Sequence, residues 1–326
     1  PHHSLYREYS RRVNDIYGQY TDLVESFGID ESWLDITGSM HLFGGDGKTV
    51  ADRLRQRLRE ELGLTISVGV SFNKIFAKLG SDYKKPDATT VIPPDHWQEI
   101  VWPLPAGDLL GVGHSTQTLL RQYGIETIGQ LAAFPRHALE TLLGKHGAQL
   151  HDYANGRDSS PVRPQHESEP VKSVGKGITF PRNLTRWEEV RAGLSMLCDS
   201  VAGRLRRQQL YCGGVALTIR DPQFHQFSHQ VRLDAPTHLQ RDIYRAALTL
   251  AQQSWHAPSP IRALTVTALY LSDSADSFQQ LDLLDSAAPQ RNDRQERLEQ
   301  AMDTIRRKYG KDAITFGNTG KLIDDE

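Results

Sequence analysis

The spacing of apolar side chains in the first hundred residues predicts helices that alternate with short strands. Apolar positions recur every three to four residues in the helical segments, as Val50, Leu54 and Leu58 do, whereas the strand segment alternates apolar and polar residues. Gly63 and Pro86 stand where two of the helices should end. The expected helices cover residues 4–20, 49–63 and 73–86, and the expected strand covers residues 64–71. This order predicts an α+β layer.

Residues 24–37, VESFGIDESWLDIT, place two adjacent carboxylates inside a pattern that otherwise predicts buried strand. Neighbouring residues of a strand point to opposite faces, so Asp30 and Glu31 can share one site only at a turn. Gly28 permits such a turn, which predicts a hairpin with the acidic pair at its tip. Carboxylates there can face a hard cation through their oxygens. An ordinary solvated turn is the competing interpretation, and this stretch alone favours it.

Residues 103–158 change to short helical patterns that are interrupted by glycines. Gly111, Val112 and Gly113 lie between two pairs of leucines. Two short helices joined by such a turn form a helix-hairpin-helix, whose backbone N–H groups at a helix N-terminus bind a DNA phosphate without reading a base. A simple helical turn is the alternative.

Beyond a polar linker over residues 159–170, residues 171–273 follow the order strand, helix, strand, strand, helix, strand. This βαββαβ order predicts four strands backed by two helices on one face, with the other face open. Four basic residues lie on or beside the predicted strands: Lys172, Lys176, Arg220 and Arg232. An open sheet face with these side chains would suit the backbone of DNA.

The distribution of charge supports a polyanionic partner. The formal net charge is −2, but residues 171–275 hold 13 Lys and Arg against 7 Asp and Glu, a net +6 that leaves −8 for the rest. Such a basic segment is typical of a surface that binds nucleic acid, although a solvated basic face is the alternative.

The remaining composition is that of a soluble globular protein, with 38% hydrophobic and 24% charged residues. No run is long enough to span a membrane and nothing resembles a signal peptide, so we expect a cytoplasmic protein without a membrane partner. Cys198 and Cys212 lack the spacing of a metal site and are expected to be buried small residues.

The order of these features resembles a Y-family translesion DNA polymerase, most of all the bacterial polymerase IV class, to about residue 273. The family's palm motif, Ser-Leu/Ile-Asp-Glu-Ala-Tyr/Phe-Leu-Asp, is matched by FGIDESWLD at residues 27–35, where Gly28 and Trp33 are departures that keep both carboxylates. The resemblance implies an α+β fold with a partial palm sheet, an all-α helix-hairpin-helix thumb and a βαββαβ little finger. Its expected parts are a partial palm (1–102), a thumb (103–158), a linker (159–170), a little finger (171–273) and a flexible C-terminal tail (274–326).

The same resemblance implies template-directed DNA synthesis past lesions, in DNA repair, with primer-template DNA and deoxynucleoside triphosphates as substrates. Asp30 and Glu31 would help to hold two Mg²⁺ ions, for which carboxylate oxygens are suitable ligands. Lys85 and Lys78 would approach the incoming triphosphate, and Lys74 would contact DNA. Gly111, Val112 and Gly113 of the thumb and the four basic residues of the little finger are the other expected DNA contacts.

The tail contains a short motif and a helical pattern. Gln280, Leu281, Leu283 and Leu284 resemble the bacterial sliding-clamp peptide Gln-Leu-x-Leu-Phe, with Leu284 where Phe is usual. The resemblance implies a sliding clamp as partner of a monomeric protein. Apolar residues near 291–308 predict a helix, and composition predicts that much of the rest is flexible.

Family members begin with a strand that bears Asp-x-Asp-x-Phe-Phe/Tyr, followed by a small fingers domain, and the sequence contains no match to either near its start. The resemblance therefore implies a fragment without polymerase activity, because a metal carboxylate and the aromatic steric gate would be missing. The alternative is a noncatalytic, clamp-tethered DNA-binding module in which the acidic pair is vestigial. A structure-specific nuclease is a weaker third hypothesis.

Overall fold

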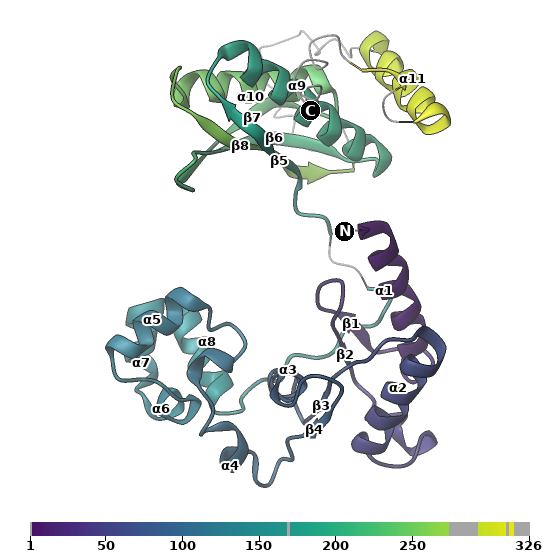
Figure 1. The fold of residues 1–326 in the computed structure, drawn as a ribbon, viewed down its shortest axis with the longest axis vertical. Helices are drawn as coiled ribbons and strands as arrows, with labels where there is room; N and C mark the ends of the chain where they lie inside the picture. The colour runs from purple at the N-terminus through teal and green to yellow at the C-terminus, as the bar shows by residue number, and fades with distance from the viewer. Residues whose placement is uncertain (1, 168–169, 274–292, 311–312, 316–326) are drawn as a thin grey trace, which may run out of the picture. The chain divides into compact units, whose positions relative to one another are not determined.

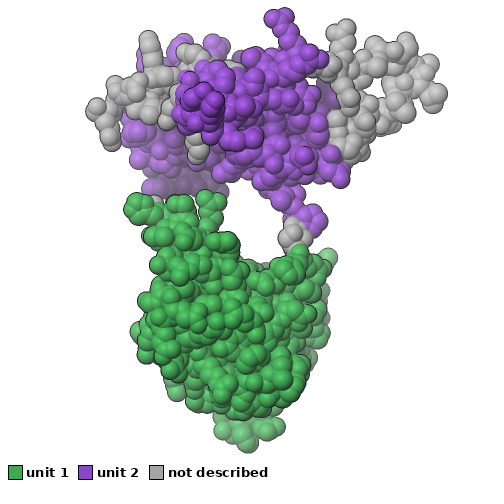
Figure 2. All heavy atoms as spheres, turned by 90° about the vertical axis from the view of Figure 1, so that its right-hand side faces the viewer, with its two compact units in different colours: residues 1–168 green, residues 169–326 purple. Residues whose placement is uncertain are grey.

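The structure is a computed structural model that describes residues 2–167, 170–273, 293–310 and 313–315. The chain divides into two compact units, residues 1–168 and residues 169–326, which Figure 2 colours separately. Within these described ranges, no helix is both long and apolar enough to cross a membrane.

Unit 1 is built from short strands and helices (Figure 1). Its strands are β1 (Val24–Ser26), β2 (Ser32–Leu34), β3 (Val68–Val70) and β4 (Thr89–Val91). Its helices are α1 (His3–Tyr17), α2 (Gly47–Leu62), α3 (Lys74–Tyr83), α4 (Trp97–Val101), α5 (His114–Gln122), α6 (Ile128–Ala133), α7 (Arg136–Leu143) and α8 (Lys145–Ala154). Short 3-10 turns lie at Met40–Leu42 and Ala106–Asp108.

The strands of the predicted palm form two separate pairs in the described residues. The sequence had instead predicted that they belong to one sheet. Strands β1 and β2 pair antiparallel, and β3 pairs parallel with β4, a strand that the sequence pattern did not indicate. Helix α3 packs on β3 and β4 and also receives a hydrogen bond from Trp33 of β2, so it lies against both pairs.

Local capping explains where the helices of unit 1 begin. Asp46 precedes α2 and its Oδ1 accepts a hydrogen bond from Thr49 N at 2.9 Å, while Asn73 Oδ1 accepts one from Phe76 N at 2.8 Å at the start of α3. Helix α2 ends at Gly63, whose φ of 67° is a left-handed conformation that glycine adopts without strain. Each cap fixes the first turn of its helix, and both helices follow the predicted pattern.

Two apolar cores hold unit 1 together. One joins α1 and α2 with the hairpin and contains Ile16, Tyr20, Val50, Leu54 and Leu58. The other runs from α3 to α8 and includes Phe76, Leu79, Trp97, Leu120 and Leu150. Because α3 shares its core with the thumb helices, the predicted boundary between residues 102 and 103 stays a prediction.

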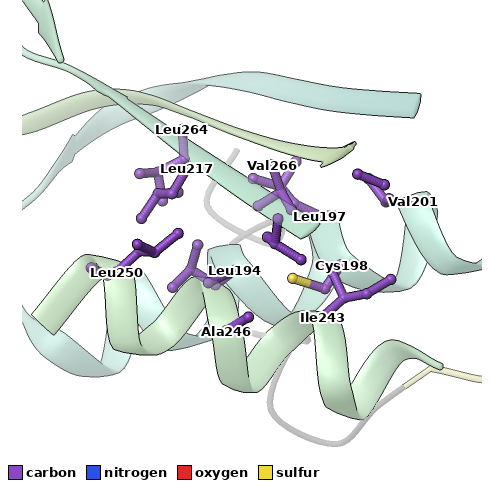
Figure 3. Close-up of a cluster of buried hydrophobic side chains, with 14 of the residues drawn as sticks. Leu194, Leu197, Cys198, Val201, Leu217, Ile243, Ala246, Leu250, Leu264 and Val266 are labelled. Carbon is purple, nitrogen blue, oxygen red and sulfur yellow. The ribbon is translucent and has the colours of Figure 1, made fainter. Parts of the chain in front are cut away.

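Unit 2 has the predicted βαββαβ order: β5 (Val174–Leu184), α9 (Trp187–Arg207), β6 (Tyr211–Arg220), β7 (Gln226–Thr237), α10 (Gln240–Ser254) and β8 (Ile261–Ser272). The strands form one antiparallel sheet in the order β5-β8-β6-β7, and α9 and α10 cover one of its faces. Figure 3 shows the core between sheet and helices, where Leu197 of α9 and Leu250 of α10 meet Leu217 and Val266 of the strands. The other face of the sheet carries no helix among the described residues.

The two cysteines lie in this core, as expected. Both are free thiols that are fully buried, and burial raises the pKa of Cys198 and raises that of Cys212 to about 12. Neither thiol is therefore reactive in the folded protein.

A further helix, α11 (Asp293–Tyr309), packs on unit 2 in a region where the sequence predicted a helix in a largely flexible tail. Met302, a residue of α11 itself, is buried. Arg206 of α9 pairs with Glu299 and, at 2.6 Å, with Asp303, and Glu299 also accepts a hydrogen bond from Gln240 N at 3.0 Å. These contacts fasten α11 to both α9 and the start of α10.

Candidate functional site

Asp30 and Glu31 lie at the tip of the β1–β2 hairpin, as the sequence predicted. Ser26 is the last β1 residue to pair and Ser32 is its partner on β2, so residues 27–31 form the turn. Phe27 N donates a hydrogen bond to Glu31 O at 2.8 Å, and Gly28 has a φ of 87°, a value that favours glycine. The break in the strand that the two carboxylates require is therefore present.

A row of alternating charges begins at this tip and continues along and just beyond α3. We call it the charge ladder: Glu31, Lys78, Asp82 and Lys85. Lys78 Nζ lies 3.3 Å from Glu31 Oε1 and also pairs with Asp82, and Lys85 Nζ lies 2.5 Å from Asp82 Oδ1. Lys78 and Asp82 are four residues apart, so they share one face of α3. Of the two lysines predicted to bind the triphosphate, Lys78 therefore contacts the predicted metal carboxylate Glu31 directly, whereas Lys85 is linked to it through Asp82 and Lys78.

Charge balance along the ladder sets the protonation of its members. Burial lowers the pKa of Lys78, but Asp82 and Glu31 outweigh this effect and raise it above the usual value. Burial likewise raises the pKa of Asp82, and the two lysines beside it reverse the effect and lower it. Both groups are therefore charged at neutral pH.

Asp30 is the carboxylate of the tip that stays open to a ligand. It is exposed, and in the described part of the chain it forms no ion pair. The described residues contain no cluster of three or more His, Cys, Asp or Glu side chains suited to a metal. Asp30 and Glu31 supply hard oxygen donors, which fit part of the six-ligand set of Mg²⁺, and the other ligands must come from elsewhere.

Lys74, predicted to contact DNA, has a different environment from Lys78. Its Nζ lies 2.5 Å from Glu25 Oε2 and 5.1 Å from the centre of the Trp33 ring, and its side chain is only 10% exposed. Trp33 Nε1 also donates a hydrogen bond to Lys74 O at 3.0 Å. Lys74 therefore joins the hairpin to α3, and a contact with DNA stays a prediction.

The thumb turn at residues 111–113 has a compact backbone. Gly111 has a φ of 96°, Val112 is buried, and Gly113 immediately precedes α5. The segment before the turn is the 3-10 turn Ala106–Asp108, where the sequence predicted a short helix; the helical conformation stops there because Leu109 has an extended backbone. The exposed start of α5 is the predicted phosphate contact.

The open face of the unit 2 sheet carries two of the four basic residues predicted there. Ile219 lies in the core, and Val231 pairs in register with the core residue Val215, so alternation places their neighbours Arg220 and Arg232 on the open face. Arg220 donates to Gln226 Oε1 at 3.1 Å, and the Arg232 guanidinium lies 4.4 Å from the centre of the Tyr270 ring. This face therefore presents fixed, partly solvated cations.

The other two basic residues lie outside that face. Lys176 pairs in register with Val266, a core residue, so its side chain belongs to the helix side of the edge strand β5, where it is exposed. Lys172 precedes β5 and is also exposed. The predicted clamp residues Gln280, Leu281, Leu283 and Leu284 lie outside the described residues.

Sequence reasoning missed Glu25 and Arg163. Glu25 is 10% exposed and accepts hydrogen bonds from Lys74 and from Arg163, which is 138 positions away in the sequence. Burial raises the pKa of Glu25, and the two basic partners outweigh this effect and lower it. The only local signal was a carboxylate at an inward strand position, and this signal does not identify the residue with which the carboxylate pairs.

Comparison with known proteins agrees with this arrangement. The chain is 41% identical to a DNA polymerase IV of Acetivibrio thermocellus over 97% of its own length and 78% of that protein, and 39% identical to one of Moorella thermoacetica over 96% and 76%. The chain belongs to the Y family of DNA polymerases. The impB/mucB/samB family of these polymerases matches residues 1–82, its C-terminal domain matches residues 171–283, and a thumb domain described for DNA polymerase-iota matches residues 107–158.

A solved structure shares the Y-family fold. A Y-family DNA polymerase chimera covers 82% of this chain and is itself covered to 76%, with a TM-score of 0.70 and 22% sequence identity. The mixed α+β architecture, the helical thumb and the little-finger sheet of this chain are therefore those of the family.

Proposed function

We propose that Asp30 and Glu31 are the metal-binding carboxylates of a template-directed DNA polymerase that acts in translesion synthesis. The observation that supports this proposal most is their place together at the hairpin tip, beside Lys78 of the charge ladder. In the reaction, the primer 3′-hydroxyl attacks the α-phosphorus of a deoxynucleoside triphosphate, and pyrophosphate leaves. Mg²⁺ bound at the pair would supply charge neutralisation for the phosphates and activation of the hydroxyl.

The residues of the ladder have distinct tasks in this proposal. Lys78 balances the charge of Glu31 before substrate arrives, because the two side chains already pair. Lys85, with a side chain that is 53% exposed, is free to turn from Asp82 toward the triphosphate and to stabilise the charge that develops on the leaving pyrophosphate. A surface ion pair of this kind is weak enough to exchange partners.

The DNA contacts that we propose are directed at phosphates. They are the start of α5 after Gly113, the exposed cations Lys172 and Lys176, and the open-face residues Arg220 and Arg232. Because backbone N–H groups and cations contact the charged phosphates rather than the bases, binding should depend strongly on salt and little on base sequence. Reversing the charge of Lys176 and Arg232 should weaken binding to any duplex in a gel shift, and unchanged binding would remove the little finger from the interface.

The clamp motif is the least supported part of the proposal, since it rests on the sequence alone. Leu283 and Leu284 changed together to Ala should reduce recovery of the protein in a pull-down with a bacterial sliding clamp, because apolar anchors give such peptides their affinity. Asp282→Ala is the matched control at the variable position of the motif. Equal recovery of all forms would make the segment an ordinary connection.

Primer extension tests the catalytic proposal. With Mg²⁺ and four deoxynucleotides, the product of the complete gene should extend a primer, and the same protein with Asp30→Ala and Glu31→Ala should not. Asp95→Ala, at an exposed carboxylate that forms no described ion pair, is the matched control and should keep activity. We propose that residues 1–326 alone do not extend, because their described carboxylates supply only part of a metal site.

Two results would overturn the proposal. Extension by the double variant at the rate of the parent would show that the acidic pair holds no catalytic metal. Binding of primer-template without extension by the complete product would favour the noncatalytic binding module.

A further inference from the structure

Residues 161–167, which follow the last thumb helix, are fastened to the hairpin region of unit 1; we call them the anchoring segment. Arg163 N donates to Glu25 Oε2 at 2.9 Å, and Arg163 Nη2 lies 3.2 Å from Glu25 Oε1. Gln165 N donates to Asp22 O at 3.0 Å, just before β1. The segment is therefore held by its backbone as well as by side chains.

Glu25 is the point at which three parts of the chain meet. Its carboxylate binds Lys74 of α3 and Arg163 of the anchoring segment, while the residue itself belongs to β1. Directly opposite Glu25 on β2 is Trp33, which donates to Lys74 O. One nearly buried carboxylate thus joins hairpin, helix and segment.

The hairpin needs such an anchor because it is small. Strands β1 and β2 have three residues each and pair only with one another in the described residues. An isolated two-stranded hairpin is marginally stable in water. Its orientation must therefore come from contacts outside the pair, and Glu25 provides the least exposed of the charged ones.

The anchor and the charge ladder lie on the same two elements. Glu25 is the middle residue of β1 and Glu31 belongs to the turn at the tip, and their partners Lys74 and Lys78 are one turn apart on α3. A change in the angle between hairpin and α3 would change the distance between Glu31 and Lys78. Glu25 and Lys74 are each 10% exposed, whereas Glu31 is 34% exposed, so the Glu25–Lys74 pair is the better fixed of the two contacts with α3, and Arg163, at 37%, holds Glu25 from the more exposed side.

We propose that Arg163 is a positioning residue for nucleotidyl transfer: through Glu25 it holds the acidic hairpin against α3 in the orientation that the reaction needs. This inference rests on the proposed function of Asp30 and Glu31. It makes the segment that leads from the thumb toward unit 2 a working part of the catalytic site. A misplacement of about 1 Å can cost as much as about 100-fold in rate, so a loosened hairpin should reduce kcat.

The first test measures single-nucleotide insertion by the product of the complete gene. Arg163→Ala should lower kcat by about tenfold, while the KM for nucleotide and the Kd for primer-template stay unchanged. Arg163→Lys should restore part of the rate, because lysine keeps the charge but loses the two-pronged contact. Arg157→Ala, at an arginine that pairs with Asp152 of the thumb, is the matched control and should keep full activity.

A double-mutant cycle tests whether Arg163 acts through Glu25. In a Glu25→Gln background, Arg163→Ala should have little further effect on kcat. Independent effects of the two changes would overturn the proposal, as would a loss that appears only in the Kd for DNA. If Asp30→Ala abolishes extension while Arg163→Ala keeps the parent rate, the positioning role fails and the proposed function stands.

A readout without catalysis uses the 326-residue chain itself. Hydrogen exchange of the amides of Phe27 and Asp35, which are bonded across the hairpin, should become faster in Arg163→Ala. Exchange of the Ile92 amide, which bonds to Val70 in the β3–β4 pair, should not change. Equal acceleration at both places would mean general loosening of unit 1, and no acceleration would mean that Arg163 does not hold the hairpin; either result overturns the proposal.

Discussion

The charge ladder of unit 1 and the charges around Arg206 in unit 2 differ most in how much water reaches them. In the ladder, the side chains of Glu31, Asp82 and Lys85 are 34%, 42% and 53% exposed, and only Lys78, at 16%, is largely covered. In unit 2, Arg206 is 7% exposed and its partner Glu299 is 2% exposed. Solvated pairs contribute little to stability and can exchange partners, whereas a buried charge must keep its partner. We therefore expect exposure to separate the ion pairs proposed to serve chemistry from those that serve architecture.

The largest effect on stability should follow removal of the Arg206 side chain. Arg206→Ala leaves Glu299 buried without its cation and also removes a hydrogen bond to His238 O. Breaking one partner of a buried pair costs about 3–5 kcal/mol. Urea unfolding followed by circular dichroism should show this loss in the transition of unit 2.

The neighbouring arginine provides the control for this change. Arg207 has the same side chain on the same helix but is exposed, so Arg207→Ala should change the free energy of unfolding by less than about 0.5 kcal/mol. Equal losses in the two variants would mean that the buried pair contributes no more to stability than an exposed arginine does.

An intermediate effect is expected at Glu189, a buried carboxylate whose cations are solvated. It accepts hydrogen bonds from Arg182 at 2.6 Å and from Thr185 N at 3.0 Å. Burial raises the pKa of Glu189, but these donors and Arg186 outweigh it and lower the pKa from 4.5 to about 2. Because the folded state binds this proton less readily, the stabilisation is complete above about pH 4.5 and is lost as the pH falls toward 2.

The size of this loss should lie between the other two cases. Arg182 and Arg186 are 52% and 68% exposed, so solvent screening reduces the contribution to about 2 kcal/mol. Thermal unfolding between pH 5 and pH 2 should show Glu189→Gln less dependent on pH than the parent. Glu188→Gln, at the exposed neighbour, should keep the parent's dependence, and an identical profile for both variants would contradict the assignment.

The sequence predicted these regions unequally well, for a physical reason. Periodicity gave the βαββαβ order, because each strand and helix has one face against the core. The turn at Asp30 could be predicted from the sequence too, because adjacent carboxylates conflict with a buried strand and Gly28 permits the break. The pairs Arg206–Glu299 and Glu25–Arg163 were not, since their members are 93 and 138 positions apart and no local pattern links them.

The smallest effect on stability, and the clearest separation of stability from function, is expected at Lys85. Its pair with Asp82 is more than 40% exposed on both sides, so Lys85→Ala should change the free energy of unfolding by less than about 0.5 kcal/mol. In the complete gene product it should nevertheless reduce kcat/KM for nucleotide, because the charge that would oppose the leaving pyrophosphate is lost. Lys84→Ala, one residue earlier and also exposed, is the matched control for primer extension. If the two variants extend primers equally well, Lys85 is an ordinary surface lysine, and exposure alone does not mark the ladder as the part of the molecule that serves chemistry.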